Sequence, residues 1–141
     1  MAYARYFGQN RSTMKSRSDA EEALGKSSTL YHQGREAMAA GDLESSIRFF
    51  EESAQIEPHF KTLELLGECF LKRGQHGEAI IPLAASVGLG NKPYRALYLL
   101  ARALHTVGRR AEAIEKLNQT VQMKPDYKSA KELLDSIRAS G

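Results

Sequence analysis

The stretch that decides the fold is Tyr94–Tyr127, YRALYLLARALHTVGRRAEAIEKLNQTVQMKPDY. Its first half carries apolar residues at steps of three and four, which places them on one helical face: Leu97, Leu100, Ala101 and Leu104. Gly108 follows, and glycine readily adopts the left-handed conformation that ends a helix. A second apolar series at helical spacing consists of Ala113, Ile114, Leu117 and Val121. Pro125 ends that helix because proline lacks an N–H and disfavours helix in the preceding residue.

The same pattern occurs twice more upstream. Gly108 matches Gly74 and Gly41, at steps of 34 and 33 residues. The other matched triplets are Leu97, Leu63 and Leu30; Ala101, Gly67 and Gly34; Ala113, Ala79 and Ser46; Leu117, Leu83 and Phe50; and Pro125, Asn91 and Pro58. A fixed period of this length is the signature of a solenoid, in which helix pairs stack because one pair cannot bury its own apolar face.

The residues of these triplets resemble the tetratricopeptide repeat. The resemblance implies an all-α, right-handed solenoid of three helix-turn-helix repeats, at residues 27–59, 60–93 and 94–127. A basic extension (1–26) precedes the repeats, and a capping helix and tail (128–141) follow them. Asn91 and Ser46 stand where the family has proline and alanine, and Gln33 where it has an apolar residue. The small residues at Gly34, Gly67 and Ala101 are expected to let the two helices of each pair approach closely.

Finer expectations concern the ends of the helices. The first two pairs are predicted at Ser28–Ala40 with Leu43–Glu57, and at Lys61–Arg73 with Gly77–Leu89. Pro82 predicts a kink or a late start in its helix. Asp126 is the expected N-cap of the final helix, whose apolar face consists of Tyr127, Ala130, Leu133, Leu134 and Ile137. Upstream, Ser18 and Glu21 form a possible capping box, and Gly25 leaves open whether a short separate helix or one long helix follows.

Residues 1–17 lie outside the repeats. The net charge of the whole chain is +3, and residues 1–18 contain four basic residues and no acidic one, so the remainder carries −1. The segment also contains three aromatic residues, Tyr3, Tyr6 and Phe7. Four interpretations stay open: a disordered terminus, aromatic side chains docked in a groove of this chain or a neighbour, an electrostatic arm for nucleic acid or anionic lipid, and a transit peptide.

Composition excludes several classes of protein. The 141-residue chain has no apolar run near 18 residues and no secretory signal, so a cytoplasmic location is expected. Cys69 is the single cysteine and is expected to be a buried, inert thiol. Phosphate-binding glycine loops, zinc-protease motifs and metal-spaced Cys/His sets are absent. The histidines are scattered, with His59 and His76 in predicted turns, so neither an enzyme nor a metal or cofactor site is expected.

Proteins that resemble this one use the first helix of each pair to line a concave surface. The residues of those helices that packing does not require are the candidate partner contacts: Tyr31, His32, Arg35, Lys61, Glu64, Leu65, Glu68, Arg95, Tyr98, Leu99, Arg102 and His105. Tyrosine and arginine are enriched at binding hot spots, and arginine can grip carboxylates with two hydrogen bonds. Glu64 and Glu68 could instead pair with those arginines inside the protein. The alternative is a solvated helix face with salt bridges between neighbours.

This pattern predicts a non-catalytic protein-interaction module, a scaffold or adaptor that binds a peptide or partner helix on the concave face. A ligand with acidic groups is one form that this partner could take. Some family members grip a peptide's C-terminal carboxylate with a Lys/Asn/Asn/Lys/Arg set, and the matching positions here hold Tyr31, Arg35, Leu65, Arg95 and Leu99. A chaperone that shields a partner segment in the same groove is the alternative function. Weak, salt-dependent nucleic-acid binding through residues 1–17 is a second alternative, and self-association through the N-terminal segment or the solenoid ends is a further possibility.

Overall fold

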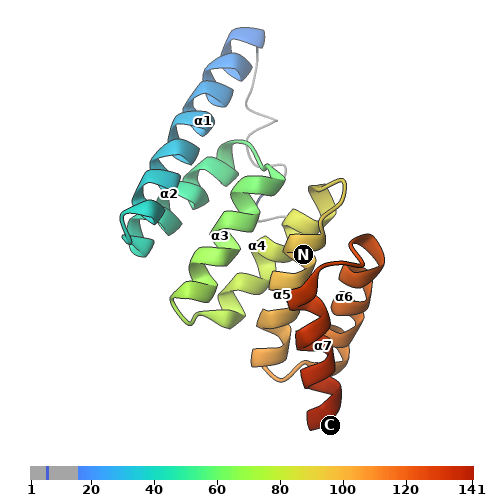
Figure 1. Ribbon diagram of the computed structural model, residues 1–141. Helices are drawn as coiled ribbons and strands as arrows, with labels where there is room; N and C mark the ends of the chain where they lie inside the picture. Colours follow the sequence, from blue (N-terminus) through green and yellow to red (C-terminus); the bar gives the residue numbers. More distant parts are fainter. Residues whose placement is uncertain (1–5, 7–15) are drawn as a thin grey trace.

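The computed structural model describes Tyr6 and residues 16–141, and this part of the chain contains seven α-helices and no strand (Figure 1). The helices are α1 (Arg17–Ala39), α2 (Leu43–Ile56), α3 (Phe60–Lys72), α4 (His76–Leu89), α5 (Tyr94–Thr106), α6 (Arg110–Met123) and α7 (Lys128–Ser140). Each odd-numbered helix packs on the even-numbered helix that follows, and each even-numbered helix packs on the next odd one. The chain is therefore the α-helical solenoid that the repeats predict. None of these helices combines the length and the apolar character needed to cross a membrane.

Glycine turns join the two helices within each pair. Gly41, Gly74 and Gly108 have φ angles of +81°, +77° and +88°, in the left-handed region that favours glycine. In each turn the glycine and the next residue donate backbone hydrogen bonds to carbonyls in the last turn of the preceding helix. This arrangement satisfies acceptors that the helix end leaves open, so the prediction of a left-handed turn at these three glycines is confirmed.

Two further glycines set how closely the helices of a pair approach. A Cβ placed on Gly34 would lie 2.6 Å from the ring of Phe50, and one placed on Gly67 would lie 2.4 Å from Leu83. Both distances are below any normal carbon–carbon contact, so a larger residue fits only if the side chain of Phe50 or Leu83 is displaced. Phe50 and Leu83 occupy the same position in their respective repeats, as the alignment of the triplets indicated.

Replacing Gly67 with leucine should therefore overpack the contact between α3 and α4. We expect a loss of about 1–3 kcal/mol in the free energy of unfolding, measured by urea denaturation. Gly25→Ala is the matched control, because a Cβ on Gly25 meets nothing within 4 Å. Alanine in that helix should stabilise the protein by about 0.5–1 kcal/mol. An unchanged unfolding free energy for Gly67→Leu would contradict the close approach of the two helices.

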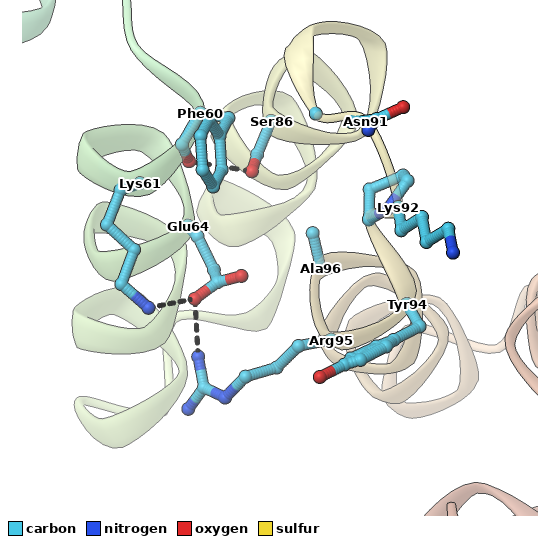
Figure 2. A pocket seen from close by; sticks show the side chains of 11 residues that line it. Phe60, Lys61, Glu64, Ser86, Asn91, Lys92, Tyr94, Arg95 and Ala96 are labelled. Carbon is cyan, nitrogen blue, oxygen red and sulfur yellow. Dashed lines mark hydrogen bonds and ion pairs between the residues drawn. The ribbon is translucent and has the colours of Figure 1, made fainter. Parts of the chain in front are cut away.

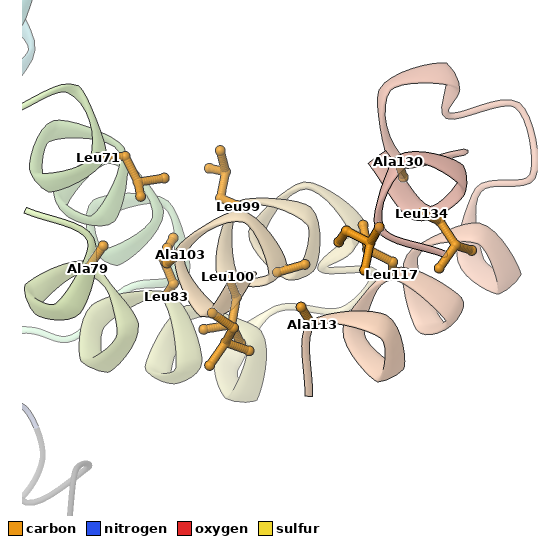
Figure 3. Close-up of a cluster of buried hydrophobic side chains, with 13 residues drawn as sticks. Leu71, Ala79, Leu83, Leu99, Leu100, Ala103, Ala113, Leu117, Ala130 and Leu134 are labelled. Carbon is orange, nitrogen blue, oxygen red and sulfur yellow. The ribbon is translucent and has the colours of Figure 1, made fainter. Parts of the chain in front are cut away.

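The core lies between the layer of odd-numbered helices and the layer of even-numbered helices (Figure 3). In its C-terminal half, Leu83 of α4, Leu100 and Leu104 of α5 and Leu117 of α6 are buried together. The final helix buries Ala130, Leu134 and Ile137 against this cluster and exposes its charged side. This confirms the predicted capping face of α7. The predicted N-cap is wrong, however: Tyr127, not Asp126, holds that position and makes no side-chain capping bond.

Helix α1 is longer than the others because it continues without a break through Gly25. It starts at Arg17, where the Ser16 side chain caps the helix by accepting a hydrogen bond from the Asp19 N–H at 3.1 Å. The expected capping box at Ser18 is therefore wrong, and one long helix is the alternative that the chain adopts. Reciprocal hydrogen bonds then tie α1 to α2: Ser27 Oγ donates to the Ser53 carbonyl (3.1 Å), and Ser53 Oγ donates to the Ser27 carbonyl (2.8 Å).

Two local expectations concern the region around α4. Of the two alternatives for Pro82, the late start is wrong, because the helix begins at His76 and has Pro82 buried in its interior. His76 is thus the first residue of a helix and not part of a turn. His59, the other histidine predicted in a turn, is the N-cap of α3, and its Nδ1 accepts the Lys61 N–H at 3.1 Å.

Tyr6 is the residue that the structure describes upstream of Ser16, and it is buried. Its cluster includes Phe50 and Ala54 of α2, Leu63, Leu66 and Cys69 of α3, and Ala85 of α4. Tyr6 therefore docks on the chain's own helices, which is one of the alternatives considered for the N-terminal segment. The remaining residues singled out there, Tyr3, Phe7, Arg5, Arg11 and Lys15, lie outside the described part of the chain.

Tyr6→Ala should remove a buried ring from the junction of the first two repeats. We expect a loss of about 3 kcal/mol in the unfolding free energy, whereas Tyr6→Phe keeps the ring and most of the stability. Thermal denaturation followed by circular dichroism measures both variants. Equal melting temperatures for Tyr6→Ala and the native chain would show that the ring does not contribute to the core.

Candidate functional site

The predicted contact residues lie on three helices of the odd-numbered layer. Tyr31, His32 and Arg35 are on α1; Lys61, Glu64, Leu65 and Glu68 on α3; and Arg95, Tyr98, Leu99, Arg102 and His105 on α5. The structure brings the residues of α3 and α5 together through direct ion pairs and a shared cavity. We keep the name concave face for the surface formed by these twelve residues.

Arg95 is the centre of an ion-pair network between α3 and α5. Its Nη1 donates to Glu64 Oε2 at 2.8 Å, and its Nη2 donates to Glu68 Oε1. Lys61 Nζ lies 3.0 Å from the same Glu64 oxygen, and Lys72 Nζ lies 3.4 Å from Glu68 Oε2. Figure 2 shows Lys61 and Arg95 converging on Glu64 from the two helices. The sequence left open that Glu64 and Glu68 pair with an arginine inside the protein. Both glutamates do so, with Arg95.

Because the two glutamates of this ion-pair network are largely buried, the network affects the stability of the fold. The side chains of Glu64 and Glu68 are only 8% and 17% exposed, whereas that of Arg95 is 40% exposed. Burial raises the pKa of Glu68, but the hydrogen bond and positive charge of Arg95, with help from Lys72, outweigh it and leave that pKa below its usual range. Burial lowers the pKa of Arg95, but its bonds to Glu68 and Glu64 outweigh that effect and raise the pKa. Removing Arg95 would leave two largely buried carboxylates without their main partner, which costs stability.

The lowered pKa of Glu68 gives a prediction for acid stability. Its carboxylate stabilises the fold fully above the ordinary value of 4.5, and this contribution is lost as the pH falls through the lowered pKa. The unfolding free energy of the native chain should therefore decrease as the pH is lowered below about 5. The unfolding free energy of Glu68→Gln should decrease less with the same change of pH, as measured by urea denaturation at each pH. Parallel curves for the two proteins would mean that Glu68 does not contribute.

A cavity of about 220 Å³ lies beside the network, between α3 and α5. Its lining consists of Glu68, Leu71, Lys72, Arg95, Leu99 and Arg102. Leu71 and Leu99 are buried neighbours (Figure 3), whereas Lys72 and Arg102 are exposed. The cavity therefore has an apolar floor, and its polar lining consists of three basic residues and one acidic residue, Glu68. Leu99 belongs to the floor, where it can contact only an inserted side chain.

The exposed arginines of the concave face lie over tyrosine rings. The Arg35 guanidinium is 6.0 Å from the ring centroid of Tyr31, and that of Arg102 is 5.8 Å from the centroid of Tyr98. No ion pair involves either arginine within the described residues. Unlike Arg95, they are therefore available to carboxylates of a partner.

Three tyrosines pack together where α5 meets α7. The ring of Tyr127 is 5.6 Å from that of Tyr94 and 5.3 Å from that of Tyr98, and Lys124 Nζ lies 5.2 Å from the Tyr94 centroid. Burial raises the pKa of Tyr127, the charge of Arg95 opposes this, and the other two tyrosines add to it. Tyr98 was a predicted contact, but Tyr94 and Tyr127 were missed. Their positions in the repeat could have indicated them, because Tyr94 is the first residue of α5 and Tyr127 is the N-cap of α7.

The remaining candidates give no sign of chemistry. His32 on α1 and His105 on α5 are both exposed. Over residues 16–141 and Tyr6, no three histidine, cysteine, aspartate or glutamate side chains gather in a way that could hold a metal ion. Cys69 is fully buried, and burial raises the pKa of its thiol to about 11. It is thus the inert thiol that its place in the sequence predicts.

Comparison with known proteins identifies the family. The tetratricopeptide repeat family matches residues 31–94 and again residues 94–133. The chain belongs to the tetratricopeptide repeat (TPR) family. TPR proteins are in general non-catalytic interaction modules, and no enzyme family is indicated. No sequence among the curated proteins matches the chain.

Solved TPR structures share the fold. The Arabidopsis OM64 TPR domain has a TM-score of 0.78 and 16% identity, over 83% of this chain and 98% of that one. The first TPR domain of Spaghetti (RPAP3), bound to the HSP90 peptide SRMEEVD, has a TM-score of 0.78 and 14% identity, over 82% and 93%. The Yersinia enterocolitica type III secretion chaperone SycD, in complex with a peptide of the translocator YopD, has a TM-score of 0.73 and 21% identity, over 80% and 92%.

Proposed function

We propose that this TPR protein is a non-catalytic adaptor that binds an acidic peptide or partner helix on the concave face. The observation that carries the proposal is the separation of charge. The concave face and the adjoining Lys72 contain five basic and two acidic residues. Residues 19–141 as a whole carry a net charge of −1, so the rest of that region is acidic. A partner with carboxylates is therefore attracted to this face and not to the others.

The contacts available on the face support the same partner. Arg35 and Arg102 are exposed, and each is placed over a tyrosine ring that restricts its movement. Beside Arg102, the 220 Å³ cavity lined by Leu71 and Leu99 can accept one apolar side chain. A segment that presents carboxylates near an apolar residue matches this combination of basic and apolar groups.

The residues available argue against recognition of a C-terminal carboxylate of the kind that some family members bind. At the matching positions, Arg95 is already engaged by two glutamates, and Leu99 is buried. Only Arg35 remains as an exposed cation, because Tyr31 and Leu65 carry no charge. We therefore propose that the ligand is an internal acidic segment, and not a chain terminus.

A chaperone that shields a partner's segment in the same groove is the second candidate. It is supported by the similarity to SycD, which was solved with a peptide of the translocator YopD. The two functions differ in the state of the free partner. An adaptor's partner is stable alone, whereas a chaperone's partner aggregates or is degraded unless this chain is co-expressed with it.

The test uses peptides selected on the native chain from a phage-displayed random library. Arg35→Glu/Arg102→Glu should weaken their binding about tenfold or more, because two charge-assisted contacts become repulsive. Isothermal titration calorimetry measures each dissociation constant. Reversal of Arg95 is unsuitable because Arg95 holds Glu64 and Glu68 in place.

The matched control is Arg48→Glu/Arg138→Glu, which makes the same change in net charge at exposed positions of α2 and α7. Its affinity should stay close to that of the native chain. Equal weakening by both double variants would show that only the overall charge matters. Unchanged binding in Arg35→Glu/Arg102→Glu would place the site elsewhere and overturn the proposal.

A further inference from the structure

Large apolar side chains are exposed mainly along one edge of the solenoid. This edge, which we call the entry edge, is where α2, α4 and α6 end and where α3, α5 and α7 begin. Among the described residues, the exposed large apolar side chains are Leu24, Phe60, Leu89, Met123 and Val107. Phe60 starts α3, while Leu89 and Met123 end α4 and α6, and Leu24 lines a cavity with Phe60. Only Val107 stands at the opposite edge, in the turn after α5.

The first cavity of the entry edge lies between α1 and the start of α3 and has a volume of about 410 Å³. Leu24, Tyr31 and Phe60 are its large apolar walls. Leu24 is present only because α1 extends beyond the length of the other helices. Ser27 and Ser53 also line the cavity, and their reciprocal hydrogen bonds fix α1 against α2 there. The cavity is therefore bounded by helices that are held in place.

The second cavity adjoins the first across Phe60 and Lys61, which line both. Its volume is about 300 Å³, and Phe60 and Tyr94 flank it (Figure 2). These two aromatic residues are the first residues of α3 and α5, one repeat apart. The Ser86 hydroxyl donates to the Phe60 carbonyl at 2.8 Å, which fixes the start of α3 against α4. The edge thus offers two neighbouring hollows, each large enough for a bulky apolar side chain.

The charges around the two cavities favour an acidic occupant. Three basic residues line them, Lys61, Lys92 and Arg95, against two acidic ones, Glu57 and Glu64. Glu64 is already bonded to both Lys61 and Arg95. No ion pair involves Lys92 anywhere in the described part of the chain. A carboxylate beside the apolar side chain would find Lys92 at the mouth of the second cavity.

We infer that the entry edge is a second contact surface, which binds a segment of the partner protein carrying two bulky apolar side chains with an acidic residue beside them. One apolar side chain enters the cavity between Leu24 and Phe60, and the other enters the cavity between Phe60 and Tyr94. Tyr31, Lys61 and Arg95 belong to both this edge and the concave face, so one ligand can continue from one surface to the other. The inference rests on the proposed function in that the ligand is a polypeptide.

The experiment measures peptides selected from the phage-displayed random library against an edge variant, Leu24→Ser/Phe60→Ser. Serine removes the apolar contact without changing charge. We expect binding about tenfold weaker than that of the native chain, because two apolar anchors are lost. Val107→Ser, at the opposite edge, is the matched control and should bind like the native chain. Lys92→Ser should also weaken binding, with a smaller effect at high salt.

The outcomes separate the edge from the concave face. Peptides that bind the edge variant normally but lose affinity for Arg35→Glu/Arg102→Glu overturn the inference and leave the proposed function standing. Peptides with the opposite behaviour support the edge and overturn the concave face. Failure to select any specific peptide overturns both. A dimer of the native chain that Phe60→Ser dissociates, seen by light scattering, would show that a second copy occupies the edge, which also overturns the inference.

Melting temperatures confirm that each variant is folded. If Leu24→Ser/Phe60→Ser unfolds, Leu24→Ser alone carries the test, because Leu24 is 52% exposed and lies on the projecting turns of α1. Its effect on selected peptides must then exceed that of Val107→Ser. Equal affinities for these two single variants would overturn the inference.

Discussion

The close approach of the two helices in the first and second pairs is the constraint on which the rest of this structure depends. At Gly34 and Gly67 there is no room for a Cβ, because the ring of Phe50 and the side chain of Leu83 fill the space. Protein interiors are close-packed, so a larger side chain at either glycine would displace its neighbours. The spacing within a pair therefore determines where its second helix lies, and this in turn sets the surface on which the next repeat packs. The position of every later helix follows from these contacts.

The Arg95 network shows how the same packing selects the residues that remain for binding. Because α3 and α5 lie side by side, the two glutamates of α3 face a guanidinium from α5 and are partly removed from water. Their charges are then satisfied inside the protein, so Arg95 contributes to stability more than to recognition. Arg35 and Arg102, which lie over aromatic rings and lack such partners in the described structure, keep the positive character of the face. Of the basic residues on this face, Arg95 therefore stabilises the fold, whereas Arg35 and Arg102 are free to contact a ligand.

The N-terminal extension of α1 completes a cavity at one end of the solenoid. In a solenoid, the first helix has no preceding repeat to cover it, and here its additional turns project past α2 (Figure 1). They bring Leu24 opposite Phe60 and so complete a cavity that α2 and α3 alone would leave open. Tyr6 supports the same end of the molecule from within the core of the first two repeats. Tyr6 and the first turns of α1 are thus parts of the folded domain.

The sequence by itself determined the solenoid, its three repeats, the glycine turns and the capping face of α7, because these depend on residues at short, regular spacings. It also indicated that Glu64 and Glu68 could pair with an arginine, since register places them on adjacent helices. The N-caps of α1 and α7, Ser16 and Tyr127, and the first residue of α4, His76, were misjudged. Local sequence offers several residues near each boundary, and tertiary packing selects where the helix begins. Only the tertiary structure decided that Leu99 is buried, that Arg95 is engaged and that Phe60 and Tyr94 flank a cavity. Those properties depend on how neighbouring repeats are placed against one another, which no single repeat encodes.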